Sequence, residues 1–410
     1  MIKSKTYFLY TKAFSDIGNM MEMMVMNAVI YSMTKSTTWL AAVLAFRVFG
    51  GILSSLFSGI LADRMNRRYL MIFSDFARGI SVIILCFYPS ATLFLIIAFL
   101  LGFFGSFFTV SFSAEIPQIF GEEKVLEVNA FISRLGAISM VIGFLSAAFL
   151  SNIVNYRVII AIDGLSFFLS ALVLIIFKWN NTLKKNGSSS WKVWISDIKE
   201  VNSYLVLRPV LLIIFVVFLF QTFAASAHNV GIPLLSEELN SKHMTFYQGL
   251  IWGSWGIGSI ISTWIIPRFP WLKNHILLFY LSTSILTSLG FILILSNKVL
   301  LLILLFAFFT GMFDAAAGTY FSTMIQQTEN DIRGRIFGIS NLLNRLGFTL
   351  GFVATSILLK IVTMPHLVWL FHGGMIGIIL IAIIYLASNK LFKIDDNFLK
   401  KKNNELTFIK

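Results

Sequence analysis

The chain has 410 residues, of which 57% are hydrophobic and 12% are charged, and 42 are phenylalanine. A soluble protein of this length could not bury so much apolar surface, whereas a protein with many membrane-spanning segments exposes it to lipid. The net charge of +13 therefore bears on which side of the membrane each loop occupies, and we expect no nucleic-acid partner.

Apolar segments long enough to cross a bilayer, about 20 residues each, recur along the whole chain. They predict an all-α integral membrane protein. The first segment follows Lys3 and Lys5 and continues too far for a cleaved signal peptide, so we expect it to be retained as a helix. Twelve such segments are present, at 7–33, 39–62, 69–88, 92–114, 126–150, 157–177, 210–235, 246–266, 275–295, 299–323, 335–359 and 367–388.

One connection is long, and it divides the twelve segments into two sets of six. It contains Lys184, Lys185 and Gly187, and then an amphipathic stretch, 191–207, that we expect to lie along the membrane surface. The predicted organisation is a six-helix bundle at 1–177, a cytoplasmic linker at 178–208, a second six-helix bundle at 209–388 and a cytoplasmic tail at 389–410.

Lysine and arginine are distributed unequally between the two sides. With both termini inside, the inner segments carry 22 of them and the outer loops carry 5. This imbalance predicts a cell-membrane protein with cytoplasmic termini. The halves also resemble each other, because Ser133-Arg134-Leu135-Gly136 recurs as Asn344-Arg345-Leu346-Gly347. Two related six-helix halves are a common way of building a transporter.

The stretch 59–68, GILADRMNRR, separates the second and third apolar segments. Read as G-x-L-A-D-R-x-x-R-R, it resembles the loop between helices two and three of the major facilitator superfamily, with Asn66 in place of the usual glycine. The alternative is an ordinary basic cytoplasmic turn. We predict that the loop and nearby charges gate the inner side; the candidates are Gly59, Asp63, Arg64, Arg67, Arg68, Asp75 and Arg134.

Further motifs narrow the resemblance. Ile116-Pro117-Gln118, Ala161-Ile162-Asp163 and Arg333-Gly334-Arg335 are similar to those of bacterial macrolide-efflux and siderophore-exporter-like proteins of that superfamily. The resemblance implies a twelve-helix major facilitator fold, alternating access and export of a bulky amphipathic compound driven by an ion gradient. The chain departs from the antiporter pattern in 143–148, which lacks the proline, and in helix four, which lacks an arginine.

Charged residues at membrane depth are costly and mark functional candidates. Asp16, Asn19 and Glu22 share one face of the first helix, and Arg47 lies near the depth of Glu22. We therefore expect a Glu22–Arg47 pair, which either serves transport or only joins two helices. Asp163 is expected near the outer end of helix six, within reach of water, with a structural role.

Asp314 and Arg345 are the corresponding candidates in the second half. Asp314 is set among glycines and alanines, so we take it as the first candidate for a proton site, the alternative being a bond to the helix backbone. Arg345 is expected to face substrate or an acid. His228 is expected to be a hydrogen-bonded packing residue, the alternative being that it titrates with a carboxylate.

The sequence thus predicts a monomeric secondary exporter that couples protons or another ion to a small-molecule substrate. Alternatives are a dedicated exporter of an endogenous siderophore or peptide, and a non-transporting receptor or immunity protein. No phosphate-binding loop, nucleophile–base set or metal-ligand cluster stands out, so we expect no enzyme activity, cofactor or metal. Cys86 is the single cysteine, which excludes an intramolecular disulfide.

Overall fold

A computed structural model describes residues 2–121, 125–177, 203–265, 275–326, 328, 330–389 and 391. Of residues 2–6, 55–64, 117, 125–127, 129–130, 326 and 330–334 it describes the backbone only. In this part of the chain the structure consists of helices and short connections. The predicted all-α architecture is confirmed. Most of the predicted linker, 178–202, lies outside the described residues.

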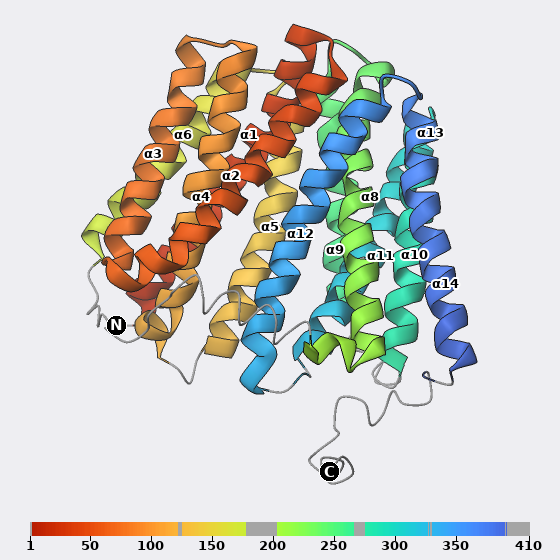
Figure 1. The fold of residues 1–410 in the computed structure, drawn as a ribbon. Helices are drawn as coiled ribbons and strands as arrows, with labels where there is room; N and C mark the ends of the chain where they lie inside the picture. The colour runs from red at the N-terminus through yellow and green to blue at the C-terminus, as the bar shows by residue number, and fades with distance from the viewer. Residues whose placement is uncertain are drawn as a thin grey trace.

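The helices of the first half form one bundle and those of the second half form another beside it (Figure 1). The first comprises α1 (Ile2–Thr34), α2 (Thr37–Arg64), α3 (Arg67–Phe87), α4 (Ala91–Phe120), α5 (Val125–Leu150) and α6 (Tyr156–Ile176). The second comprises α8 (Pro209–Leu239), α9 (Met244–Ile265), α10 (Ile276–Leu295), α11 (Leu300–Gln326), α12 (Asn330–Leu358) and a last helix made of α13 (Met364–Val368), a π-helical turn (Trp369–Gly373) and α14 (Gly374–Ser388).

Ten helices in the described part of the chain are long and apolar enough to cross a membrane. The two other long helices are α1 and α9. Helix α1 carries Lys12, Asp16 and Glu22 in its middle, and α9 is rich in glycine, serine and tryptophan. Both pack between other helices, where polar and small side chains are tolerated, so their composition follows from their interior position.

The connection predicted as a ten-residue loop is shorter than expected. Helix α2 continues to Arg64 and α3 begins at Arg67. Asn66 caps α3, because its side-chain oxygen accepts a hydrogen bond from the Arg68 backbone N–H at 3.0 Å. The charged residues therefore lie in the last turn of α2 and the first turn of α3 instead of forming a loop, since the membrane boundary does not end the hydrogen bonding of a helix.

Equivalent glycines bring helices together in the two bundles. A Cβ built on Gly102 of α4 would lie 1.8 Å from the Arg47 carbonyl oxygen of α2. A Cβ built on Gly311 of α11 would likewise lie 1.8 Å from the Trp255 carbonyl oxygen of α9. Both positions require glycine, because backbone touches backbone. The pairs α2–α4 and α9–α11 are thus related in the way that the sequence repeat predicts.

We call the end of the molecule at which α1 begins the basal end, at the bottom of Figure 1, and the opposite end the apical end. The halves meet through α5 with α9 and through α2 with α12. At the apical end Lys35 pairs with Glu237, and His243 Nδ1 lies 2.6 Å from Asn152 Oδ1. The contact between α5 and α9 extends from there to mid-depth, so the halves are joined on the apical side.

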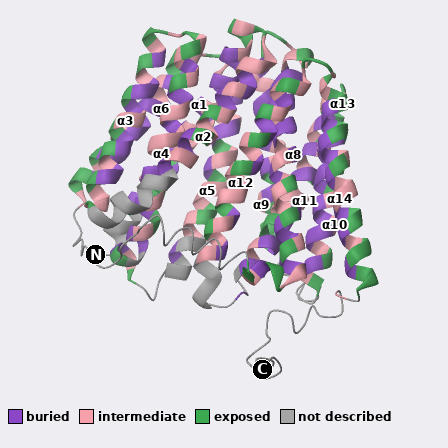
Figure 2. Ribbon diagram, viewed as in Figure 1, coloured by how far each residue is buried: buried purple, intermediate pink, exposed green. Residues whose placement is uncertain are grey.

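Buried and exposed side chains are arranged as expected for a protein surrounded by lipid (Figure 2). Buried apolar side chains lie between the helices, yet many large apolar side chains point outward, among them Leu301 and Ile381, which are 76% and 68% exposed. By contrast Glu22, Asp75 and Asp163 are wholly buried. Polar groups inside and apolar groups outside are the pattern of a membrane protein whose interior carries the function.

Candidate functional site

Two cavities lie in the middle of the molecule. The first has a volume of about 450 Å³ and is lined mainly by charged and polar side chains of α1, α2, α3 and α4; we call it the charged cavity. The second has a volume of about 410 Å³ and is lined mainly by aromatic side chains of the second half; we call it the aromatic cavity. Asn344 and Phe348 of α12 line both, so the cavities adjoin at that helix.

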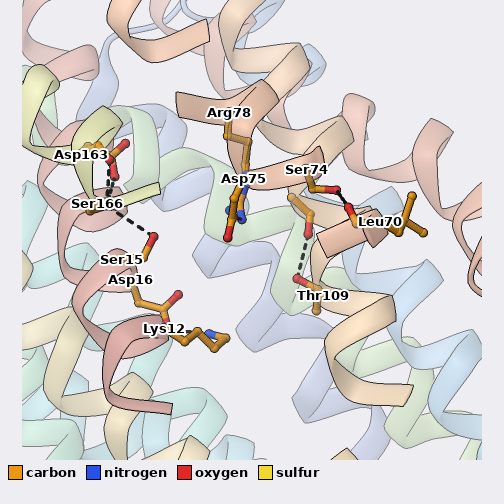
Figure 3. Close-up of polar contacts among 11 residues, drawn as sticks. Lys12, Ser15, Asp16, Leu70, Ser74, Asp75, Arg78, Thr109, Asp163 and Ser166 are labelled. Carbon is orange, nitrogen blue, oxygen red and sulfur yellow. Dashed lines mark hydrogen bonds and ion pairs between the residues drawn. The ribbon is translucent and has the colours of Figure 1, made fainter. Parts of the chain in front are cut away.

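Ion pairs within single helices supply part of the wall of the charged cavity (Figure 3). On α1, Lys12 Nζ lies 2.5 Å from Asp16 Oδ2, one turn apart. On α3, Arg78 pairs with Asp75. The Arg78 guanidinium also lies over the ring of Phe167, at 4.3 Å from its centroid. Asp75 was predicted to belong to the gate, and in the structure it lines the charged cavity.

The expected Glu22–Arg47 ion pair is present. Arg47 Nη1 lies 3.0 Å from Glu22 Oε2, and Arg47 Nη2 donates to Asn19 Oδ1 at 2.5 Å. Glu22 is wholly buried and its second oxygen, Oε1, has no hydrogen-bond partner among the described residues. Asn19, Arg47 and Asp16 line the charged cavity, whereas Glu22 lies behind Arg47. The polar face predicted for α1 therefore faces the interior, with Arg47 as its cation.

Asp163 is more deeply placed than the sequence suggested. Its side chain is wholly buried, so the expectation that it reaches water is wrong. The reason is packing: its Oδ1 lies 2.8 Å from the position that a Cβ on Gly18 would occupy, so α1 covers it. The hydroxyl of Ser166 lies 3.5 Å from Oδ1, and Oδ2 has no hydrogen-bond partner in the described part of the chain.

Arg345 crosses from the second half into the charged cavity. A Cβ built on Gly51 of α2 would lie 2.2 Å from Arg345 Nη1, so the guanidinium lies directly against the backbone of α2 at this glycine. Arg345 lines that cavity together with Lys12, Arg47 and Arg78. No acidic side chain among the described residues forms an ion pair with it. Of the two expected alternatives, substrate or an acid, the position in the cavity wall is compatible with the first.

The aromatic cavity combines a broad apolar wall with few polar groups. Its lining includes Trp252, Trp255, Tyr280 and Phe291, and the flexible side chains of Met20 and Met23 from α1. Trp252 packs edge-on against Trp255, with ring centroids 5.5 Å apart. Such a wall offers adaptable contacts to a bulky apolar ligand.

His228 belongs to a buried pair in this wall. Its Nδ1 lies 3.2 Å from His372 Nε2, and its ring stacks on Phe291 with centroids 3.5 Å apart. The expected packing role with a hydrogen bond is thus present. His372 was missed, because its partner lies 144 residues away in the chain and neither histidine has a local motif.

Asp314 projects into the aromatic cavity from α11. In the described part of the chain its carboxylate forms no hydrogen bond or ion pair, and the alternative of a bond to the helix backbone is not found. A carboxylate beside an apolar wall loses hydration, and without a nearby cation nothing stabilises its charged form in return. It can therefore exchange a proton or accept a cationic group.

The gate candidates are placed at the basal end. Arg67 Nη1 donates to the Ala114 carbonyl oxygen of α4 at 3.2 Å, and Arg68 donates from Nε to the Leu174 carbonyl oxygen of α6 at 2.6 Å. These bonds tie α3 to α4 and α6 within one half. Arg134 is exposed on α5. The side chains of Gly59, Asp63 and Arg64 lie outside the described residues, so the gating role stays a prediction.

Comparison with known proteins agrees with this architecture. Residues 11–352 match the family model described as Major Facilitator Superfamily. The chain is 24% identical over 326 residues to BacE of Bacillus subtilis strain 168, a protein named as a putative bacilysin exporter, covering 77% of this chain and 79% of that protein. It is 22% identical over 380 residues to macrolide efflux protein A of Streptococcus pyogenes, covering 89% of each.

Solved structures share the fold at low identity. The nucleoside transporter NupG superposes with a TM-score of 0.70 at 12% identity and covers 93% of this chain and 98% of that one. A D-xylose–proton symporter superposes with a TM-score of 0.68 at 14% identity, covering 91% and 96%. These likenesses concern the fold alone.

Proposed function

This chain belongs to the major facilitator superfamily, and on that premise we propose that it exports a bulky amphipathic small molecule by proton antiport through alternating access. The observation that carries the proposal is the aromatic cavity with Asp314 in its wall. A volume of about 410 Å³ lies in the range typical of small-molecule sites. Its two tryptophans, its tyrosine and its methionines suit a large apolar body.

Asp314 is our first candidate for the coupling group. A proton and a cationic part of the substrate would compete for its carboxylate, so that binding of one releases the other. The titratable groups that share the cavity are His228, His372 and Tyr280; the two histidines are hydrogen-bonded to each other. Asp16 and Glu22 are the other candidates, but each already has a cation, Lys12 or Arg47, within 3.0 Å or less.

We propose that the basal end faces the cytoplasm of a bacterial cell. The excess of lysine and arginine in the basal connections supports this orientation. The Lys35–Glu237 ion pair joins the halves at the apical end, and α5 and α9 are in close contact at Gly249 near that end, which supports an inward-facing state with the outer side closed. One chain supplies the walls of both cavities, so we propose that the monomer is the working unit.

The relatives support two classes of substrate. The name of macrolide efflux protein A favours an antibiotic of that kind. The name of BacE, as a putative bacilysin exporter, favours a dedicated exporter of an endogenous metabolite, such as a siderophore or peptide. The wide aromatic wall favours the first class, because it offers many contacts that do not depend on exact geometry.

The test is transport by purified protein in proteoliposomes, with erythromycin and ethidium as probes. We expect an imposed pH gradient to drive uptake into vesicles in the inside-out orientation. Asp314→Asn should abolish that uptake and preserve exchange of labelled probe without a gradient. Asp16→Asn and Glu22→Gln are the controls at the other two candidate acids, and a melting temperature must first show that Glu22→Gln is folded, because it leaves Arg47 without its acid.

If Asp314→Asn transports normally and one of the control variants is uncoupled, the proton site belongs on α1. If all three variants transport normally, proton coupling through these acids is refuted. Substrate binding without any proton flux in the unmodified protein would favour a receptor instead of an exporter.

A further inference from the structure

The charged cavity holds one cation more than its acids neutralise. Lys12 is paired with Asp16, Arg47 with Glu22 and Arg78 with Asp75. Arg345 is the remaining cation of the lining, and no acid among the described residues pairs with it. Asp163 lines neither cavity, since α1 covers it at Gly18. The cavity therefore presents a single uncompensated positive group to whatever enters it.

Arg345 reaches from α12 to the backbone of α2. Its guanidinium occupies the space next to Gly51 that any side chain would fill, since a Cβ there would lie 2.2 Å from Nη1. Its own helix, α12, continues through Asn344 and Phe348, which line both cavities. Arg345 thus lies at the junction of the two cavities, on the charged side.

The aromatic cavity has an acid without a cation to neutralise it. Asp314 is the acid of its lining, and no cation of the described residues contacts it. His228 and His372 are hydrogen-bonded to each other and stacked on Phe291. When Asp314 is ionised, this cavity presents a single uncompensated negative group.

From this juxtaposition, and resting on the proposed function, we infer that the two adjoining cavities form one site for a zwitterionic amphiphile. Its anionic group binds Arg345, its cationic group binds Asp314, and its apolar body lies along Phe348 and the tryptophan wall. Arg345 and Asp314 come from α12 and α11 of the same half, so the second half supplies both charges that hold the ligand.

The energetic reason is compensation of charge away from water. A purely cationic ligand would neutralise Asp314 and leave Arg345 without a partner, and a purely anionic ligand would do the reverse. Either of these ligands gains one charge-assisted contact and leaves the other partly buried charge without a partner. A zwitterion compensates both groups, and its cationic end replaces the proton on Asp314, which links binding to proton release.

Equilibrium binding to the purified full-length protein tests this inference. The probes are three compounds with one aromatic body: phenylalanyl-phenylalanine, which is a zwitterion, its C-terminal amide, which is a cation, and its N-acetyl derivative, which is an anion. At pH 6.5 we expect calorimetry to give tighter binding of the zwitterion by roughly tenfold or more over each derivative, as one charge-assisted contact predicts.

The variants assign each end of the ligand. Arg345→Gln should make the zwitterion and the amide bind equally, and Asp314→Asn should make the zwitterion and the N-acetyl derivative bind equally. Arg157→Gln is the matched control, because this cation lies at the apical start of α6, outside both cavities, and should keep the preference. Unchanged melting temperatures establish that the variants fold.

Equal binding of zwitterion and amide by the unmodified protein, a preference that survives Arg345→Gln, or no binding of any probe at millimolar concentration would each overturn the inference. These results do not depend on transport. Export of a cationic probe with proton exchange, together with no preference for the zwitterion, would leave the proposed function standing and refute this inference alone.

Discussion

The contact between α5 and α9 offers the sharpest test of the apically closed state. A Cβ built on Gly249 would lie 2.5 Å from the Phe144 carbonyl oxygen and 2.5 Å from the Ala148 side chain. The first of these is backbone and cannot rotate away, so Gly249→Ala must push α5 and α9 apart by about 1 Å to reach ordinary van der Waals contact.

The steric cost decides the equilibrium between conformations. Overpacking of this kind costs about 1–3 kcal/mol. The higher helix propensity of alanine, about 0.5–1 kcal/mol, is gained in both conformations and cancels. The apically closed state should therefore lose a factor of roughly 5 to 150 in population relative to the apically open one.

Double electron–electron resonance can measure this shift. Spin labels at Ser90 and Lys298 lie at the apical end of the two halves, in protein with Cys86 replaced by Ser. We expect Gly249→Ala to add a longer distance or make it dominant. Gly377→Ala is the control, because a Cβ there meets nothing within 4 Å. An unchanged distribution in a folded Gly249→Ala protein, or an equal shift in the control, would refute the reasoning.

Three further predictions concern the orientation of the chain and two of its buried acids. In the same cysteine-free background, Cys at Ser90 should react with an impermeant maleimide in intact cells and Cys at Asn389 should not; the reverse would invert the proposed topology. Glu22→Gln should destabilise the protein by about 3–5 kcal/mol, because it leaves Arg47 without its acid, and a melting temperature within about 1–2 °C of the parent would contradict the importance of that pair. Asp163→Asn should leave the melting temperature equal or higher, since Asp163 is a buried acid without an ion pair among the described residues; a marked loss would mean that its charge is needed.

Local patterns in the sequence predicted the helices and one of the polar contacts. Apolar runs of membrane-spanning length predicted the twelve long helical segments because lipid imposes both length and composition. The Glu22–Arg47 pair could be predicted from equal depth on neighbouring helices, since rise per residue is regular. Asp314 was expected to be a functional residue because charged groups at membrane depth are costly, and it lines the aromatic cavity.

Contacts between distant segments could not be predicted. Asp163 was expected to reach water from its place in α6, but burial depends on Gly18 of α1, which approaches closely enough to cover it. His228 and His372 come together only because α8 packs against the last helix. The connection between α2 and α3 was predicted too long, because charged helical turns at the membrane boundary have the same composition as a loop.

The distribution of charge between the halves bears on how such a site could work during alternating access. The cations of the first half that line the charged cavity, Lys12, Arg47 and Arg78, are each neutralised by an acid of that same half. Arg345 and Asp314, which have no such partner among the described residues, both belong to the second half. In the proposed binding mode, rocking of the halves would therefore not separate the two charges that hold the ligand. The first half could slide past with its ion pairs intact, so the change of access would break no buried ion pair of the cavity wall and the ligand would remain bound until the second half faced the other side.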